Sequence, residues 1–179
     1  MTINKSIGFI LLILISFQGI SQKKEDTPIK FDEKSKEYKV IINKEVLKKY
    51  SFNSDYPAVT LSLRQNTFIY SLNNSPYEKA ENFNQESKNA DLWIEPRDPE
   101  INSFPEETSQ LKLVNQKWEF NYLKNIKDFT LSEYAIERKN IKTGTIFLIK
   151  MTEGKIFKVR IDSFNIEKEE ISLTYKLLE

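Results

Sequence analysis

Cysteine and histidine are both absent from this 179-residue chain, and together their absence excludes a large share of protein chemistry. Without cysteine no disulfide can form, so the folded chain has to be held by its apolar core. Without histidine it lacks the usual general base, the commonest transition-metal ligand and the ordinary pH-sensitive group. Ser-His-Asp and Cys-His catalysis, and zinc sites made of thiolates or imidazoles, are therefore excluded.

The chain also has no large excess of charge of either sign, because it contains 27 lysines and arginines and 26 aspartates and glutamates. A balanced chain has no electrostatic footprint for nucleic acid or for an anionic membrane surface. Nucleic acid is therefore not an expected partner.

The first 21 residues have the three parts of a secretory signal peptide. Lys5 precedes an apolar run over 7–17, and small residues follow at Gly19 and Ser21. The run is too short to span a bilayer comfortably, although an uncleaved N-terminal anchor is the alternative. No cysteine follows it that could carry a lipid, so we expect a periplasmic or extracellular protein that is not a lipoprotein. After cleavage no membrane span is expected.

Period-two alternation of apolar residues predicts a mainly β fold, an antiparallel sheet or sandwich with one or two short helices. Residues 22–35 are predicted to be a flexible lead-in, and 36–179 a single β-rich domain. Strands are expected at 37–43, 111–113 and 118–122, with a short apolar core segment at 92–94 and a hairpin formed by 59–64 and 67–72. The segments 145–151, 157–161 and 171–177 predict a C-terminal three-strand meander, with Gly154 in its first turn.

Helices and breaks are predicted from capping residues and prolines. Asn43 is placed to cap a helical turn over 44–50, and Ser75-Pro76 to open a short helix ending near Asn84. Pro96, Pro99 and Pro105 interrupt ladder pairing, so 95–109 is predicted to be an ordered loop or an edge segment.

Acidic residues offer weak candidates for catalysis or metal binding. Glu133 with Glu137, or Asp91 with Glu95, could in principle serve as the carboxylate pair of a glycoside hydrolase, but such residues are ordinarily solvated surface. A loop holding Asp98, Glu100, Glu106 and Glu107 could hold calcium, yet it lacks the Asp/Asn ladder and central glycine of a known calcium loop. We expect no catalysis, no metal and no cofactor.

Aromatic residues are the better candidates for a binding site. Trp93, Trp118 and Tyr122 are the candidate ligand-binding residues, able to stack on a sugar-like or planar ligand. The competing interpretation is that both tryptophans fill the core, Trp93 especially, because Leu92 and Ile94 flank it.

A basic stripe and one methionine complete the candidates. Lys155, Lys158 and Arg160 are predicted to lie on an exposed strand face, where lysines also discourage aggregation. Met151 ends a predicted strand and is expected to fill the core.

The segment 144–159, with its Thr152-Glu153-Gly154-Lys155 turn, resembles the HmuY family of exported bacterial haem-binding proteins. The later strand 171–175 and Asp91-Leu92-Trp93 are similar to further parts of that family. The resemblance implies an all-β exported protein. Members bind haem through paired histidines or methionines, a ligand set that this chain cannot supply, so the resemblance implies a divergent member with another ligand, with none, or with haem held by one Met or a Tyr.

Three functional hypotheses follow from the sequence. The first is an exported, non-catalytic binding or interaction module. The second is a structural or assembly component of the cell envelope that contacts other envelope proteins. The third, and the least favoured, is a carboxylate-dependent glycoside hydrolase.

Overall fold

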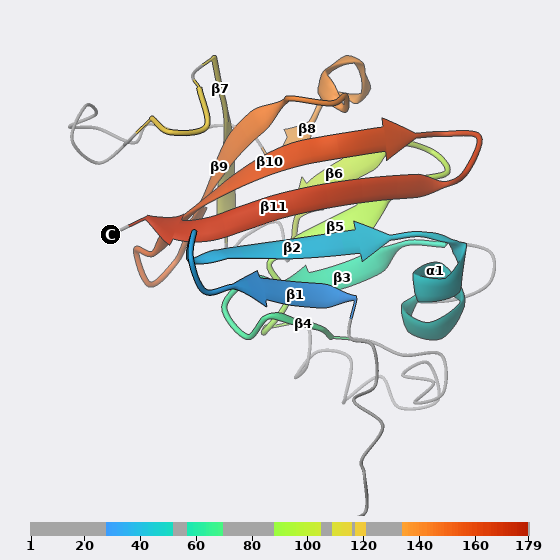
Figure 1. The fold of residues 1–179 in the computed structure, drawn as a ribbon, viewed down its shortest axis with the longest axis horizontal. Helices are drawn as coiled ribbons and strands as arrows, with labels where there is room; N and C mark the ends of the chain where they lie inside the picture. The colour runs from blue at the N-terminus through green and yellow to red at the C-terminus, as the bar shows by residue number, and fades with distance from the viewer. Residues whose placement is uncertain are drawn as a thin grey trace, which may run out of the picture.

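The computed structural model of this chain contains two antiparallel β-sheets packed face to face (Figure 1). It describes residues 28–51, 57–69, 88–104, 109–115, 117–120 and 134–178. The predicted signal peptide and the helix predicted to begin at Ser75 lie outside these residues. The mainly β, antiparallel fold class predicted from the sequence is confirmed.

Sheet A has six strands and sheet B has five. In spatial order, sheet A consists of β1 (Ile29–Asp32), β2 (Glu37–Ile42), β11 (Glu170–Leu178), β10 (Ile156–Asn165), β9 (Ile146–Met151) and β7 (Ser109–Val114). Sheet B consists of β4 (Thr67–Phe68), β3 (Val59–Ser62), β5 (Leu92–Glu95), β6 (Glu100–Ser103) and β8 (Ala135–Ile136). Helix α1 spans Lys44–Tyr50, and the 3-10 turn η3 spans Arg138–Asn140.

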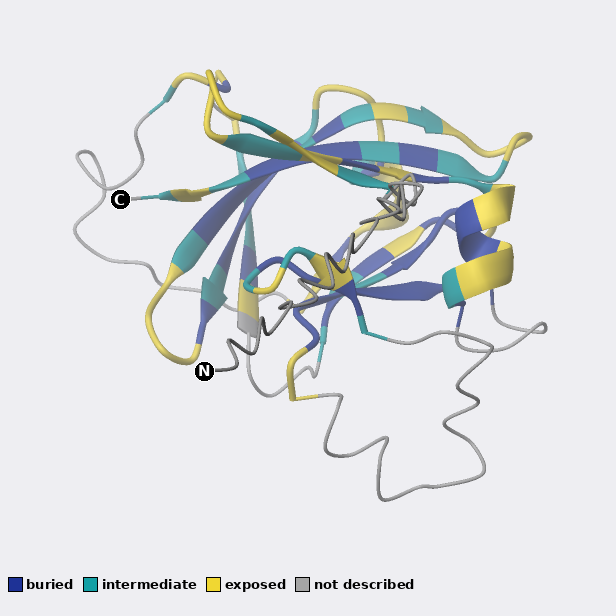
Figure 2. Ribbon diagram, turned by 60° about the horizontal axis from the view of Figure 1, so that its bottom comes forward, coloured by how far each residue is buried: buried dark blue, intermediate teal, exposed yellow. Residues whose placement is uncertain are grey.

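The hydrophobic core lies between the inner faces of the two sheets (Figure 2). In β2, Val40 and Ile42 are fully buried, whereas Ile41 between them is 48% exposed. Leu61 of β3 and Leu92 of β5 enter the same cluster from sheet B. Successive side chains on a strand point to opposite faces, so each sheet supplies alternate residues to one shared core.

The predicted C-terminal meander is confirmed. Strand β10 pairs antiparallel with β9 and with β11, so that Phe157 lies opposite both Ile149 and Leu177. Gly154 in the β9–β10 turn has φ 88°, a conformation that favours glycine over residues with a Cβ atom. Met151 at the end of β9 belongs to the core, as predicted.

Two local predictions near the N-terminal end of the domain are also confirmed. The Asn43 side chain accepts hydrogen bonds from the backbone N–H groups of Glu45 and Val46, at 3.1 and 3.0 Å. This caps α1, whose Val46 and Leu47 pack into the core. Strands β3 and β4 form the predicted hairpin, although β4 spans only Thr67–Phe68.

The prediction for residues 95–109 is wrong in part. Residues 100–103 form β6, which pairs with β5 on one side and β8 on the other and is therefore not an edge strand. Pro96 and Pro99 lie in the turn that joins β5 to β6, where a missing backbone N–H breaks no ladder bond. The proline-free stretch after the turn is long enough for a four-residue strand.

Strand β1 lies within the stretch predicted to be a flexible lead-in. It pairs with β2 along its whole length, which places Phe31 opposite Tyr38. The Phe31 and Tyr38 rings are 4.6 Å apart, and Tyr38 stacks on Tyr175 of β11 at 5.3 Å. This aromatic ladder packs β1 against the sheet in spite of its polar neighbours.

A buried carboxylate holds the arginine that joins the two sheets. Asp91 is fully buried and accepts hydrogen bonds from the Ser62 hydroxyl, from the Arg64 backbone N–H and from Arg64 Nε, the last at 2.8 Å. Arg64 also donates to Glu153 in the β9–β10 turn and to the Lys88 carbonyl, at 3.1 and 3.0 Å. Burial raises the pKa of Asp91, and its bonds and attraction to Arg64 act in the opposite direction. Arg64 thus ties the start of β5 in sheet B to a turn of sheet A.

Removing this carboxylate should destabilise the fold strongly. We expect Asp91→Ala to lower the free energy of unfolding by about 3–5 kcal/mol, because it leaves the guanidinium and the Ser62 hydroxyl without their buried partner. Urea unfolding followed by circular dichroism measures the change. The matched control is Asp98→Ala, since Asp98 pairs with Arg138 at 2.8 Å on the open surface. Equal losses in the two variants would contradict the structural role of Asp91.

Candidate functional site

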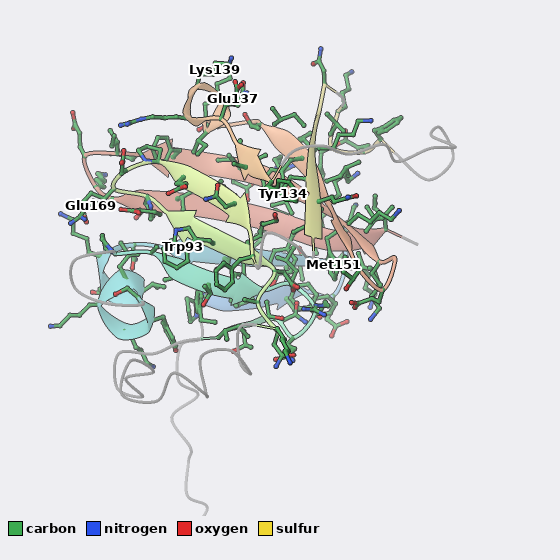
Figure 3. The ribbon with its side chains drawn as sticks, turned by 180° about the vertical axis from the view of Figure 1, so that it is seen from behind. Trp93, Tyr134, Glu137, Lys139, Met151 and Glu169 are labelled. Atoms are coloured by element: carbon green, nitrogen blue, oxygen red, sulfur yellow. The ribbon has the colours of Figure 1, made fainter. Side chains whose placement is uncertain are left out.

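Trp93 lies on the outer face of sheet B. Its neighbours Leu92 and Ile94 point into the core, so Trp93 between them points away from it. The expectation that flanking apolar residues place Trp93 in the core is therefore wrong, because on a strand the flanking residues occupy the opposite face. Figure 3 shows the Trp93 side chain on sheet B. The side chain is half-buried, and the centroid of its ring lies 5.9 Å from that of the Phe104 ring.

A cross-strand row passes through Trp93, and we call Thr60, Trp93 and Asn102 the Trp93 row. Thr60 of β3 and Asn102 of β6 lie directly opposite Trp93 on its two sides. Directly opposed residues have Cβ atoms about 4.5–5.5 Å apart, so these polar groups border the indole. Thr60 is only 1% exposed.

Two polar atoms of this row are buried and lack a hydrogen-bond partner among the residues that the structure describes. They are Thr60 Oγ1 and Asn102 Oδ1. The other end of the Asn102 amide is engaged, because Nδ2 donates to Glu100 at 2.5 Å. A buried polar atom without a partner is costly, and it is a common sign of a bound water, ion or ligand group.

Glu95 extends the same outer face at the end of β5. It is 8% exposed, and burial raises the pKa of its carboxyl, with Glu100 and Asp98 acting in the same direction. Arg97, 4.0 Å away, opposes that rise. The outer face of sheet B thus carries an indole, a hydroxyl, an amide carbonyl and a carboxyl, and all of these except the indole are buried.

The predicted carboxylate pair Asp91 and Glu95 is not brought together. Asp91 and Glu95 are four residues apart on an extended segment, about 13 Å along the chain, and Asp91 is occupied by Arg64. Glu137 pairs with Lys139 at 2.5 Å, and Glu133 lies outside the described residues.

The predicted calcium loop is only partly described. Asp98 pairs with Arg138, while residues 106 and 107 lie outside the described ranges. Within the described ranges, no group of three or more acidic side chains is placed to hold a metal ion.

Trp118 lies on the opposite side of the molecule, over the outer face of sheet A. Residues 117–120 form a turn and not the predicted strand, and Tyr122 lies outside the described residues. The indole Nε1–H donates to Glu37 at 2.8 Å, and three cations surround the ring. Lys158 Nζ, Arg160 Cζ and Lys176 Nζ lie 4.8, 4.7 and 5.2 Å from its centroid.

Lys158 is buried under this turn and is not part of an exposed stripe. It is 2% exposed, and its ammonium donates to the backbone carbonyls of Trp118 and Phe120, the second at 2.7 Å. The prediction was wrong because residues distant in sequence cover the outer face of β10. Arg160 is half-buried and pairs with Asp162 at 2.6 Å, whereas Lys155 is exposed, as predicted.

The two tryptophans therefore have different surroundings and do not form one platform. The Trp118 ring is 9% exposed and already contacts cations, so it has no open face for a ligand. Of the predicted binding residues, Trp93 alone is described in a setting that suits one. Thr60 and Asn102 were missed, because only the register of three strands places them beside Trp93.

Burial of Lys158 should give the protein a measurable dependence on pH. Burial, with repulsion from Lys176, lowers the pKa of Lys158 below its ordinary 10.5. Between the lowered value and 10.5 the unfolded chain binds more protons than the folded one, so stability contributed by this residue rises with pH across that window. Lys158→Met lacks this contribution.

The measurement is urea unfolding from about pH 8 to 10.5, comparing wild type with Lys158→Met. We expect the stability difference to move in favour of the wild type as pH rises. Burial raises the pKa of Tyr175, and this effect is shared by both proteins and cancels. Lys39→Met, on the exposed part of the same sheet face, should follow the wild type. A pH-independent difference for Lys158→Met would contradict the argument.

Comparison with known proteins adds little. No protein-family model matches the chain, and no curated protein matches it. No helix among the described residues is long and apolar enough to cross a membrane. A solved structure of a candidate lipoprotein from Bacteroides fragilis is similar, with a TM-score of 0.47 and 10% identity over 86% of this chain and 96% of that chain. A likeness of this degree supports no conclusion about function or location.

Proposed function

We propose that this protein is an exported, non-catalytic binding module whose ligand contacts the Trp93 row. The observation that carries the proposal is the pair of buried, unpartnered atoms Thr60 Oγ1 and Asn102 Oδ1 on either side of a half-buried indole. Export rests on the sequence of residues 1–21.

The chemistry of the row favours a ligand with hydroxyl groups and a flat apolar face, as in a sugar ring. Asn102 Oδ1 accepts a hydrogen bond, and Thr60 Oγ1 can donate or accept one. The indole supplies a large contact area with little loss of conformational freedom. Glu95, further along the same face, adds an acceptor when ionised.

Kinship with the HmuY family is a further part of the proposal, and it would make haemin a second ligand to test. The antiparallel β architecture is compatible with it. Met151 is 2% exposed and packs in the core, so it could not reach a bound haem iron without repacking. A haem ligand would have to come from elsewhere in the chain.

An envelope assembly role is the second candidate, favoured by one specific feature. Strand β1 is an edge of sheet A, and its Phe31 is 43% exposed. Edge strands with exposed apolar residues can add a strand from another chain. Chemical cross-linking in the native envelope that returns only the monomer would argue against this role.

Thr60 offers a test in which stability and binding should move in opposite directions. Thr60→Val removes a buried hydroxyl that has no partner, so we expect the free energy of unfolding to rise by about 1 kcal/mol. The matched control is Thr174→Val on sheet A, fully buried as well, whose hydroxyl donates to Asp162. Its loss should lower stability by about 1–2 kcal/mol.

Binding is measured by tryptophan fluorescence during titration with oligosaccharides and, separately, with haemin. We expect a saturable change that Trp93→Ala abolishes and Thr60→Val weakens, while Thr174→Val leaves the dissociation constant unchanged. A saturable fluorescence change that persists in Trp93→Ala would show that the ligand binds at another site. No response to either ligand at micromolar concentration would remove the small-ligand form of the proposal.

A further inference from the structure

A pocket of about 450 Å³ lies at one end of sheet A, where β7 finishes and β9 begins. One wall is formed by Leu113, Val114 and Asn115, and the other by Asn140 and residues 142–146. Val114 lies opposite Ile146 in the ladder, so the end of the β7–β9 pair supplies apolar surface to the pocket. The volume falls within the roughly 300–1,000 Å³ typical of small-molecule sites. Trp93 is not among its lining residues.

The wall over 140–145 is fixed by its own hydrogen bonds. The Thr145 hydroxyl donates to the Asn140 carbonyl at 2.6 Å, and the Gly144 N–H donates to the Ile161 carbonyl at 2.8 Å. Gly144 has φ 87°, and a Cβ atom added there would meet nothing within 4 Å. The backbone conformation therefore requires glycine, while the space beside it is open. The pocket is shaped before any ligand arrives.

Lys142 is the one charged residue among the described residues that line the pocket. It is exposed and has no ion-pair partner within the part of the chain that the structure describes. The side chains of Asn115, Asn140 and Thr143 likewise form no hydrogen bond with another described residue. An ammonium, two amides and a hydroxyl together offer donors to oxygen atoms of a negatively charged group.

We propose that this pocket binds a small molecule bearing an oxyanion, a carboxylate or a phosphate. Lys142 supplies the charge, Thr143 and the asparagines donate to the remaining oxygens, and the body of the molecule lies on Leu113, Val114 and Ile146. The inference does not depend on the Trp93 row, which carries no basic residue and lies on the other sheet. The protein would then have two sites of different chemistry.

The test is titration of the full ¹⁵N-labelled chain with inorganic phosphate, with acetate, and with uncharged acetamide, followed by NMR. We expect saturable shifts of the Thr143 and Gly144 amide signals with phosphate, acetate or both, and none with acetamide. Phosphate alone would identify the ligand as a phosphate ester, and acetate alone as a carboxylic acid. Linear, unsaturated shifts, or shifts spread over other lysine-bearing strands, would overturn the proposal.

Variants of Lys142 and Lys139 distinguish a specific anion site from a general attraction of anions to lysines. Lys142→Gln should weaken binding about tenfold or more, since a hydrogen bond to a charged group is lost, whereas Lys142→Arg should retain most of it. The matched control is Lys139→Gln, three residues earlier in the chain and paired with Glu137 outside the pocket lining. Equal weakening by Lys142→Gln and Lys139→Gln would overturn the proposal.

Discussion

Apolar contact between the inner faces of the two sheets is the constraint on which the rest of this structure depends. The chain has no cysteine, so every strand has to keep its alternate residues in one shared core. The same alternation sends the remaining residues to two outer faces. The Trp93 row and the Trp118 cluster lie on those outer faces.

The two outer faces differ in how far their buried polar groups find hydrogen-bond partners. On sheet A, the 117–120 turn covers β10, and the buried Lys158 is satisfied by backbone carbonyls. On sheet B, Asp91 is satisfied by Arg64, but Thr60 and Asn102 each have a buried atom without a partner among the residues that the structure describes. Satisfied polar groups are ordinary structure, whereas unsatisfied ones point to a missing contact. That contrast is why the proposed ligand is placed on sheet B.

Much of the fold could be predicted from sequence because period two is a local property. The strands of the meander, the Asn43 cap and the glycine turn at 154 are each determined within about ten residues. The errors arose where distant segments meet. The interpretation that placed Trp93 in the core from its neighbours was wrong, and so was the prediction that Lys158 is exposed, because the sequence does not reveal which segment covers which face. Thr60 and Asn102 carry no local signal at all.

The bonds that Lys158 makes to the 117–120 turn determine which substitutions the turn can accept. The Lys158 ammonium binds main-chain carbonyls of Trp118 and Phe120, which every residue type possesses. A substitution at position 119 or 120 would leave those two backbone acceptors in place, whereas the indole of Trp118 is a side-chain requirement, through Glu37 and the three cations. The path of the turn across the sheet therefore depends on main-chain atoms that a substitution does not remove.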